Sequence, residues 1–148
     1  RFEEIIYKKK SSKIIIDYAH TPDAMQNVLK SYTSKSFKPS LVFGCGGERD
    51  KSKRKKMSVI ANKYAKKVYL TDDNPRNENA NLIRKTLKKY CQKARDISNR
   101  RLAIQTAISE MHQKDILIIA GKGHEKYQII KNKNYLFDDF KVAKDCIK

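Results

Sequence analysis

Short apolar runs alternate with amphipathic segments along most of the 148-residue chain, and this alternation limits the possible folds more than any other feature. The apolar runs lie at 13–17, 40–43, 67–71 and 116–119, and they have the length of buried strands. Between them, apolar residues recur every three or four positions, which indicates helices. Strands that alternate with helices favour a mainly parallel sheet with helices on both faces. We therefore expect one three-layer α/β domain over residues 1–148, with a sheet of about six strands.

The remaining apolar residues fit five helices. These are predicted at 22–32, beginning at Thr21 or Pro22; at 57–64; at 82–90, capped near Asn79; at 102–111; and at the C-terminal end, capped by Asp138 or Asp139. On the second helix we expect the outer face to carry Lys53, Arg54, Lys55 and Lys56. Two weaker strands at 127–130 and 134–137 flank a Lys-Asn-Lys turn, and we expect this pair to form an antiparallel edge of the sheet.

The charge balance is strongly basic, with 34 Lys and Arg against 16 Asp and Glu and a formal net charge of +18. Basic surfaces attract nucleic acid, so a basic nucleic-acid-binding module is one hypothesis. However, 26 of the basic residues are Lys, a bias that codon usage across a whole proteome can produce. Nucleic-acid binders more often place Arg and aromatic groups in a recognisable motif. We therefore expect no specific nucleic-acid partner.

Cysteine usage and hydropathy indicate the compartment. Cys45, Cys91 and Cys146 are odd in number, far apart and in no CxxC pair, which favours a reducing environment over a disulfide framework or a zinc site. No apolar stretch approaches the roughly 18–20 residues of a membrane-spanning helix, and no signal-peptide pattern opens the chain. We expect a cytoplasmic protein with no membrane partner and no structural metal.

Polar and glycine-rich segments follow each of the four main predicted strands. They are Asp17–Asp23, Gly44–Arg54, Asp72–Asn77 and Gly121–Glu125. In parallel sheets, ligands bind beyond the carboxyl ends of the strands. All four segments would lie along one edge of the sheet, so together they predict one binding site.

Each segment also has a purely structural interpretation. Asp17 and Thr21 can cap a helix, the glycines after residue 43 can form a turn, and 72–76 can be an Asx-type turn with a solvated arginine. At Cys45 we favour a small residue in a crowded turn over a reactive thiol. The glycines match neither GxxxxGK[ST] nor GxGxxG. In 121–125, two glycines let the backbone approach a ligand while the Lys, His and Glu side chains stay available.

The charges of these segments predict the kind of ligand. Arg49 and Arg76 suit carboxylates or phosphates, and Asp73 and Glu125 suit an ammonium group. A small zwitterion with more than one charged end fits this set. No Ser-His-Asp grouping and no hydrolytic carboxylate pair is evident, so we expect no catalytic residue in this domain.

Taken in order, these segments resemble the C-terminal domain of the Mur ligases. The residues that carry the resemblance are Asp17–Asp23, Phe43–Gly47, Arg49–Lys51, Thr71–Arg76 and Ala120–Glu125, and it runs from Arg1 to the last helix. It implies a Rossmann-like, amino-acid-binding domain of an ATP-dependent amide ligase in peptidoglycan synthesis. It also implies that the N-terminal UDP-sugar domain and the central domain, which holds ATP and Mg²⁺, are missing here, so that the domain alone is inactive.

Within this family the Asp-Asn-Pro-Arg form of the 73–76 loop resembles that of the ligases that add meso-diaminopimelate to UDP-MurNAc-L-Ala-D-Glu. The resemblance implies substrate contacts at Arg49, Asp73, Asn74, Pro75, Arg76, Gly121 and Glu125, and nucleotide contacts at Arg1, Asp17, His20 and Lys51. Arg76 would pair with the distal carboxylate, and Glu125 and the Gly121 carbonyl would hold the distal ammonium. A Mur-type domain for another amino acid is the alternative. Glu48 and the run Asn99–Leu102 depart from the family pattern.

Overall fold

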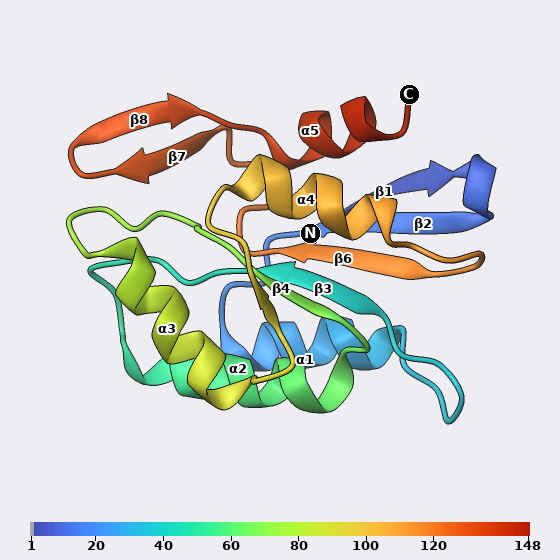
Figure 1. The fold of residues 1–148 in the computed structure, drawn as a ribbon, viewed down its shortest axis with the longest axis horizontal. Coiled ribbons are helices and arrows are strands. Elements are labelled where there is room, and N and C mark those ends of the chain that lie inside the picture. Colours follow the sequence, from blue (N-terminus) through green and yellow to red (C-terminus); the bar gives the residue numbers. More distant parts are fainter. Residues whose placement is uncertain (1) are drawn as a thin grey trace.

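The computed structural model describes residues 2–148, and its elements follow the predicted alternation (Figure 1). The strands are β1 (Phe2–Tyr7), β2 (Ser12–Asp17), β3 (Ser40–Phe43), β4 (Val68–Leu70), β5 (Arg95–Asp96), β6 (Ile116–Ala120), β7 (Tyr127–Ile130) and β8 (Lys133–Leu136). The helices are α1 (Pro22–Ser31), α2 (Ser52–Tyr64), α3 (Ala80–Tyr90), α4 (Arg100–Ser109) and α5 (Asp139–Cys146), with a 3-10 turn, η1 (Lys8–Lys10).

The main sheet has six strands in the order β1-β2-β6-β3-β4-β5, which confirms the predicted strand number. Strands β2, β6, β3, β4 and β5 are parallel to one another, and β1 pairs with β2 in antiparallel fashion. The antiparallel edge is therefore present, but we assigned it to the wrong residues. The predicted hairpin, β7–β8, forms a separate two-stranded sheet because β1 already covers the free edge of β2.

The strands bury side chains on both faces, as in a doubly covered parallel sheet. Helices α1, α2 and α3 cover one face and α4 and α5 the other (Figure 1). Along β2, Ile15 belongs to the first core, whereas Ile14 and Ile16 belong to the second, as the two-residue period of a strand requires. These two cores cover the faces of the sheet, and the loops lie at its carboxyl edge.

Side-chain caps begin α1, α3 and α5 at the predicted places. Thr21 Oγ1 accepts from the Ala24 amide at 3.2 Å, and Asn79 and Asp138 cap α3 and α5 in the same way. Each such cap contributes roughly 1 kcal/mol to stability. Asn99 departs from the family pattern, but its side chain still caps the first turn of α4.

One residue of α2 is placed differently from our prediction. Arg54 does not face outward with Lys55 and Lys56, which are exposed, but is buried. Its guanidinium pairs with Glu78 and donates to the Gly46 carbonyl, both at 3.0 Å. Arg54 lies three residues before the buried Met57, so it shares the inward face of the helix.

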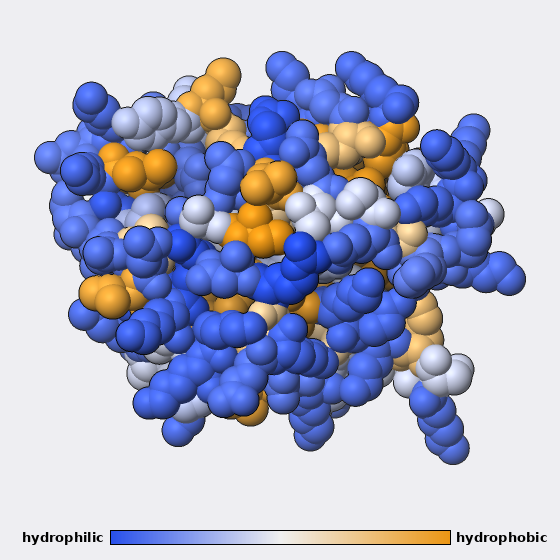
Figure 2. Space-filling model, in the orientation of Figure 1, coloured by the Kyte–Doolittle hydropathy of each residue, from blue (hydrophilic) through white to orange (hydrophobic). Residues whose placement is uncertain are grey.

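The face of the molecule shown in Figure 2 is mostly hydrophilic, with apolar side chains in small separate groups. Single exposed apolar side chains are ordinary on soluble domains. Within residues 2–148 there is no helix with the length and apolarity needed to span a lipid bilayer.

Candidate functional site

Loops after β2, β3, β4 and β6 surround a cavity of about 300 Å³ at the carboxyl edge of the sheet. Its lining residues are Tyr18, His20, Gly46, Arg49, Lys53, Asp73, Asn74, Arg76, Gly121 and Glu125. The fold thus brings together six of the seven residues that we expect to bind an amino acid. The exception is Pro75, which lines a neighbouring cavity with Asn77 and Ile130.

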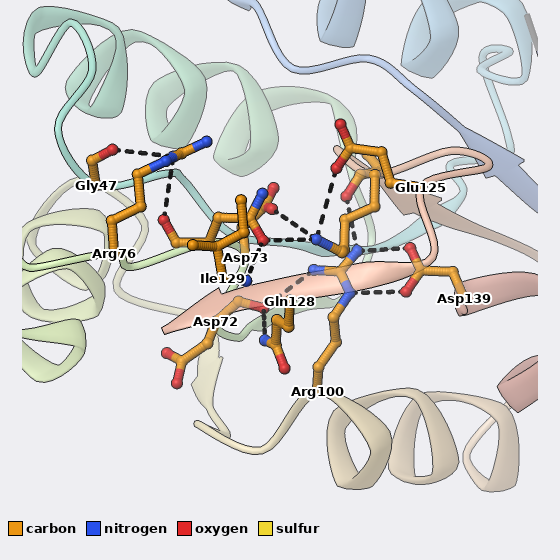
Figure 3. A network of polar contacts seen from close by, with 12 residues as sticks. Gly47, Asp72, Asp73, Arg76, Arg100, Glu125, Gln128, Ile129 and Asp139 are labelled. Carbon is orange, nitrogen blue, oxygen red and sulfur yellow. Dashed lines mark hydrogen bonds and ion pairs between the residues drawn. The ribbon is translucent and has the colours of Figure 1, made fainter. Parts of the chain in front are cut away.

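Arg76 is held firmly on the β4–α3 loop. Its backbone adopts a positive φ of 53°, its amide donates to Ile129 and its carbonyl accepts from Lys131, at 3.0 and 2.7 Å. Its Nη1 donates to the carbonyls of Gly47 and Asn74 at 3.0 and 3.3 Å (Figure 3). Both side-chain bonds use the same nitrogen, which leaves the rest of the planar guanidinium to bind a carboxylate.

The carboxamide of Asn74 has a fixed orientation. Its Oδ1 accepts from Lys122 Nζ at 2.8 Å and from the Ile129 amide at 3.0 Å. Both partners can only donate, so the opposite orientation would set donors against donors. Asn74 therefore offers Nδ2, a donor, to a ligand, which suits a carboxylate.

Asp73 and Glu125 give the cavity an acidic side. Lys122 lies behind them, and its Nζ is 3.4 Å from Asp73 Oδ1 and 3.6 Å from Glu125 Oε1. We expected Lys122 to stay available to a ligand, and this is wrong, because its side chain is fully buried. Gly121 has a φ of 112°, and an added Cβ would lie 2.8 Å from Asp73 Oδ2. Only glycine lets the Asp73 carboxylate approach the backbone here.

Arg49 and Lys53 give the cavity a basic side. Arg49 is exposed, and its Nη1 donates to the Glu48 carbonyl at 3.0 Å. Lys53, which we placed among solvent-facing lysines, donates to the His20 carbonyl at 3.0 Å. Lys53 lies in the first turn of α2, next to the glycine-rich loop. This position was the sequence signal that could have placed Lys53 at the site.

The residues that we expect to touch a nucleotide separate into two places. Asp17 accepts from the Ala19 amide at 2.7 Å, and the His20 ring lies 4.4 Å from the Tyr18 ring. Lys51 pairs with Glu78 at 3.8 Å and lines a different groove, beside Pro22. Arg1 lies outside the described residues. In the part of the chain that the structure describes, no group of three or more His, Cys, Asp or Glu side chains could hold a metal ion.

A fully buried ion pair supports the floor of the site. Arg100 Nε and Nη2 bind the two oxygens of Asp139 at 2.8 and 2.7 Å (Figure 3). Arg100 also donates to the carbonyls of Asp72 and Ala120, each at 3.2 Å. Burial on its own lowers the pKa of Arg100, but the Asp139 carboxylate outweighs this effect and raises that pKa above its ordinary value. We did not anticipate this pair from the sequence.

The architecture and the site can now be compared with known proteins. The family described as "Mur ligase, glutamate ligase domain" matches residues 1–123. The chain belongs to the Mur ligase family. This match confirms the resemblance that the ordered loop motifs indicated.

Curated relatives of this Mur ligase domain carry the name UDP-N-acetylmuramoyl-L-alanyl-D-glutamate--2,6-diaminopimelate ligase. The protein from Rickettsia rickettsii is 48% identical over 93% of this chain, and that from Buchnera aphidicola subsp. Baizongia pistaciae is 45% identical over 97%. The aligned regions are 30% and 29% of those proteins, so the chain spans about 30% of the length of these relatives.

Solved structures confirm the fold of the domain. A structure of a ligase of the same name covers 99% of this chain and 31% of its own, with a TM-score of 0.89 and 38% identity. A folylpolyglutamate synthase from Thermotoga maritima covers 82% of this chain and 27% of its own, with a TM-score of 0.59 and 21% identity. The similarity to the folylpolyglutamate synthase shows a shared fold and nothing more.

The cysteines of this Mur ligase domain should differ sharply in reactivity. Burial, with a smaller effect of Asp73, raises the pKa of Cys45 to about 12, and burial also raises the pKa of Cys91. Burial also raises the pKa of Cys146, but this thiol is partly exposed, whereas the other two are buried. With iodoacetamide at about pH 8, we expect Cys146 to be alkylated first and the other two only on unfolding. Peptide mass spectrometry checks this order, with the denatured chain as the control, and early labelling of Cys45 would contradict it.

Proposed function

We propose that this domain binds meso-diaminopimelate for an ATP-dependent amide ligase of peptidoglycan synthesis. The supporting observation is that one cavity of about 300 Å³ is lined both by acidic groups, Asp73 and Glu125, and by donors from Arg76 and Asn74. A diamino-dicarboxylate needs both kinds of group, whereas an amino acid with a single carboxylate leaves Arg76 unmatched. The names of the relatives, which include 2,6-diaminopimelate, agree with this ligand.

Each side of the cavity has its own role in this proposal. Arg76 and the Nδ2 of Asn74 bind the distal carboxylate, and Arg49 binds the other carboxylate. Glu125, Asp73 and the Gly121 carbonyl bind the distal ammonium, and Pro75 shapes the loop. Hydrogen bonds between charged groups contribute roughly 1.5–3 kcal/mol each. Bound in this way, the free amine is oriented for attack on the phosphorylated carboxyl carbon of the acceptor, where the amide bond forms as the bond to phosphate breaks and phosphate leaves. Orientation lowers the barrier of such a step.

ATP, Mg²⁺ and the acceptor UDP-MurNAc-L-Ala-D-Glu complete the proposed reaction. No stretch of the 148 residues matches GxxxxGK[ST], so these residues offer no P-loop for the phosphates. Asp17, His20 and the exposed Tyr18 fit the edge of a nucleotide site, with Arg1 and Lys51 as further candidates. When bound, ATP supplies the phosphoryl group that activates the acceptor carboxylate. Soluble substrates and three free thiols support a cytoplasmic location.

Titration of the chain with meso-diaminopimelate and with lysine tests the proposal. Chemical shifts of the backbone amides report binding even when it is weak. We expect meso-diaminopimelate to bind more tightly, because lysine lacks the distal carboxylate. In Arg76→Ala, the affinity for meso-diaminopimelate should fall about 10- to 150-fold while that for lysine stays the same.

Arg101→Ala is the matched control, because Arg101 is exposed on α4 and does not line the cavity. Its affinities should equal those of the wild type. Equal affinity of the wild-type chain for both amino acids, or full selectivity in Arg76→Ala, would show that the substrate is wrong.

A further inference from the structure

Lys122 places a fully buried ammonium group at the point where three ligand-facing side chains meet. Its Nζ lies 2.8 Å from Asn74 Oδ1, 3.4 Å from Asp73 Oδ1 and 3.6 Å from Glu125 Oε1. Asp73 lies on the loop after β4 and Glu125 on the loop after β6. A buried ammonium needs such partners, because an unpaired charge is very costly in the interior. All three partners line the cavity, so Lys122 connects two separate loops of the site.

The charges in the cluster around Lys122 are nearly balanced. Arg100 has its own counter-ion in Asp139, with both side chains fully buried. Asp73 and Glu125 together carry two negative charges, and Lys122 supplies one positive charge against them. One negative charge therefore remains for a ligand, which matches a single ammonium group.

Lys122 also fixes the orientation of Asn74. Its bond to Oδ1 turns the Asn74 carboxamide so that Nδ2 is left to donate. The Ile129 amide makes a second bond to the same oxygen at 3.0 Å. The orientation of Asn74 thus has two supports, whereas Asp73 and Glu125 are linked to each other through Lys122.

We propose that Lys122 is a positioning residue that holds Asp73 and Glu125 together as the ammonium-binding side of the site. This inference rests on the proposed function and adds a specificity determinant to it. Lys122 touches no substrate, because its side chain is fully buried. It acts through the two carboxylates, which it orients and partly neutralises. Without this ammonium the carboxylates repel each other and lose their common geometry.

Lys122 could instead merely compete with the ligand ammonium for the two carboxylates, and its removal would then have the opposite effect on affinity. If Lys122 only occupied Asp73 and Glu125, its removal would free both groups and tighten the binding of a ligand ammonium. A positioning residue, when removed, weakens that binding. The direction of the change in affinity therefore separates the two roles.

The test is Lys122→Met, which keeps an unbranched side chain of similar length and removes the charge. The chain is titrated with meso-diaminopimelate and with 2-aminopimelate, which has both carboxylates and lacks the distal ammonium. We expect the affinity for meso-diaminopimelate to fall about tenfold or more, and that for 2-aminopimelate to change less than about threefold. Lys122→Gln, which keeps a donor toward Asn74, should show the same selective loss and serves if the methionine variant does not fold.

Lys126→Met is the control, because Lys126 is exposed, pairs with Asp138 at 2.8 Å and does not line the cavity. It should bind both ligands like the wild type. Tighter binding of meso-diaminopimelate in the Lys122 variants, or equal losses for both ligands, would overturn the positioning role. A wild-type chain that does not prefer meso-diaminopimelate to lysine would instead overturn the proposed function.

Discussion

Arg100→Met is expected to lower the free energy of unfolding by about 3–5 kcal/mol. Arg100 and Asp139 are both fully buried and share two hydrogen bonds, at 2.8 and 2.7 Å. Removal of the guanidinium leaves the Asp139 carboxylate in the interior without a counter-ion. It also removes the donors to the carbonyls of Asp72 and Ala120. Urea unfolding followed by circular dichroism measures the change.

Two further variants separate the ion pair from the loss of side-chain volume. Arg101→Met makes the same change at the exposed neighbouring position and should stay within about 0.5 kcal/mol of the wild type. Arg100→Met combined with Asp139→Leu removes both charges and should regain part of the loss, because no unpaired charge remains. A single Arg100→Met variant as stable as the wild type would refute the structural importance of the pair.

The strand–helix alternation made most of the fold predictable, but the edges of the main sheet were not. Strand β1 has the sequence FEEIIY, of which only Ile5 is buried, so it lacks the apolar run of a central strand. Strand β5 has two exposed residues and no pattern at all. Edge strands are held by backbone pairing, and their position depends on which neighbour leaves an edge free. The antiparallel edge was therefore expected at β7–β8 and formed by β1.

The loops of the site were predictable, whereas its buried cations were not. Position at the ends of the strands was enough to place Arg49, Arg76 and Glu125 together. Burial of a cation depends on its counter-ion, and here the partners are distant in sequence. The separations are 24 residues for Arg54 and Glu78, 39 for Arg100 and Asp139, and 49 for Lys122 and Asp73. A local pattern carries no information over such distances, so it did not mark Arg54, Arg100 or Lys122 as buried.

Gly47→Ala should disable the site through a backbone clash. An added Cβ would lie 1.9 Å from the Pro75 carbonyl oxygen, so the β3–α2 and β4–α3 loops would have to separate. Gly47 joins these loops through its amide, which donates to Asn74 O at 2.8 Å, and its carbonyl, which accepts from Arg76 Nη1 at 3.0 Å. Separation breaks both bonds. We expect stability to fall by about 1–3 kcal/mol and the affinity for meso-diaminopimelate to fall about 10- to 150-fold, as when a charged contact is lost.

Gly46→Ala provides the comparison, because its Cβ would meet only the far end of the flexible Arg76 side chain, at 2.9 Å. The end of a side chain shifts at a lower cost than the backbone, so the free energy of unfolding should fall less than in Gly47→Ala. Because the displaced guanidinium is the one proposed to bind the carboxylate, Gly46→Ala is the control for stability and not for affinity. The two variants thus separate a clash with backbone from a clash with a side chain at adjacent positions. Urea unfolding and the ligand titration are run on both. If Gly47→Ala bound meso-diaminopimelate like the wild type, the contact between the two loops would not be what holds Arg76 in its binding position.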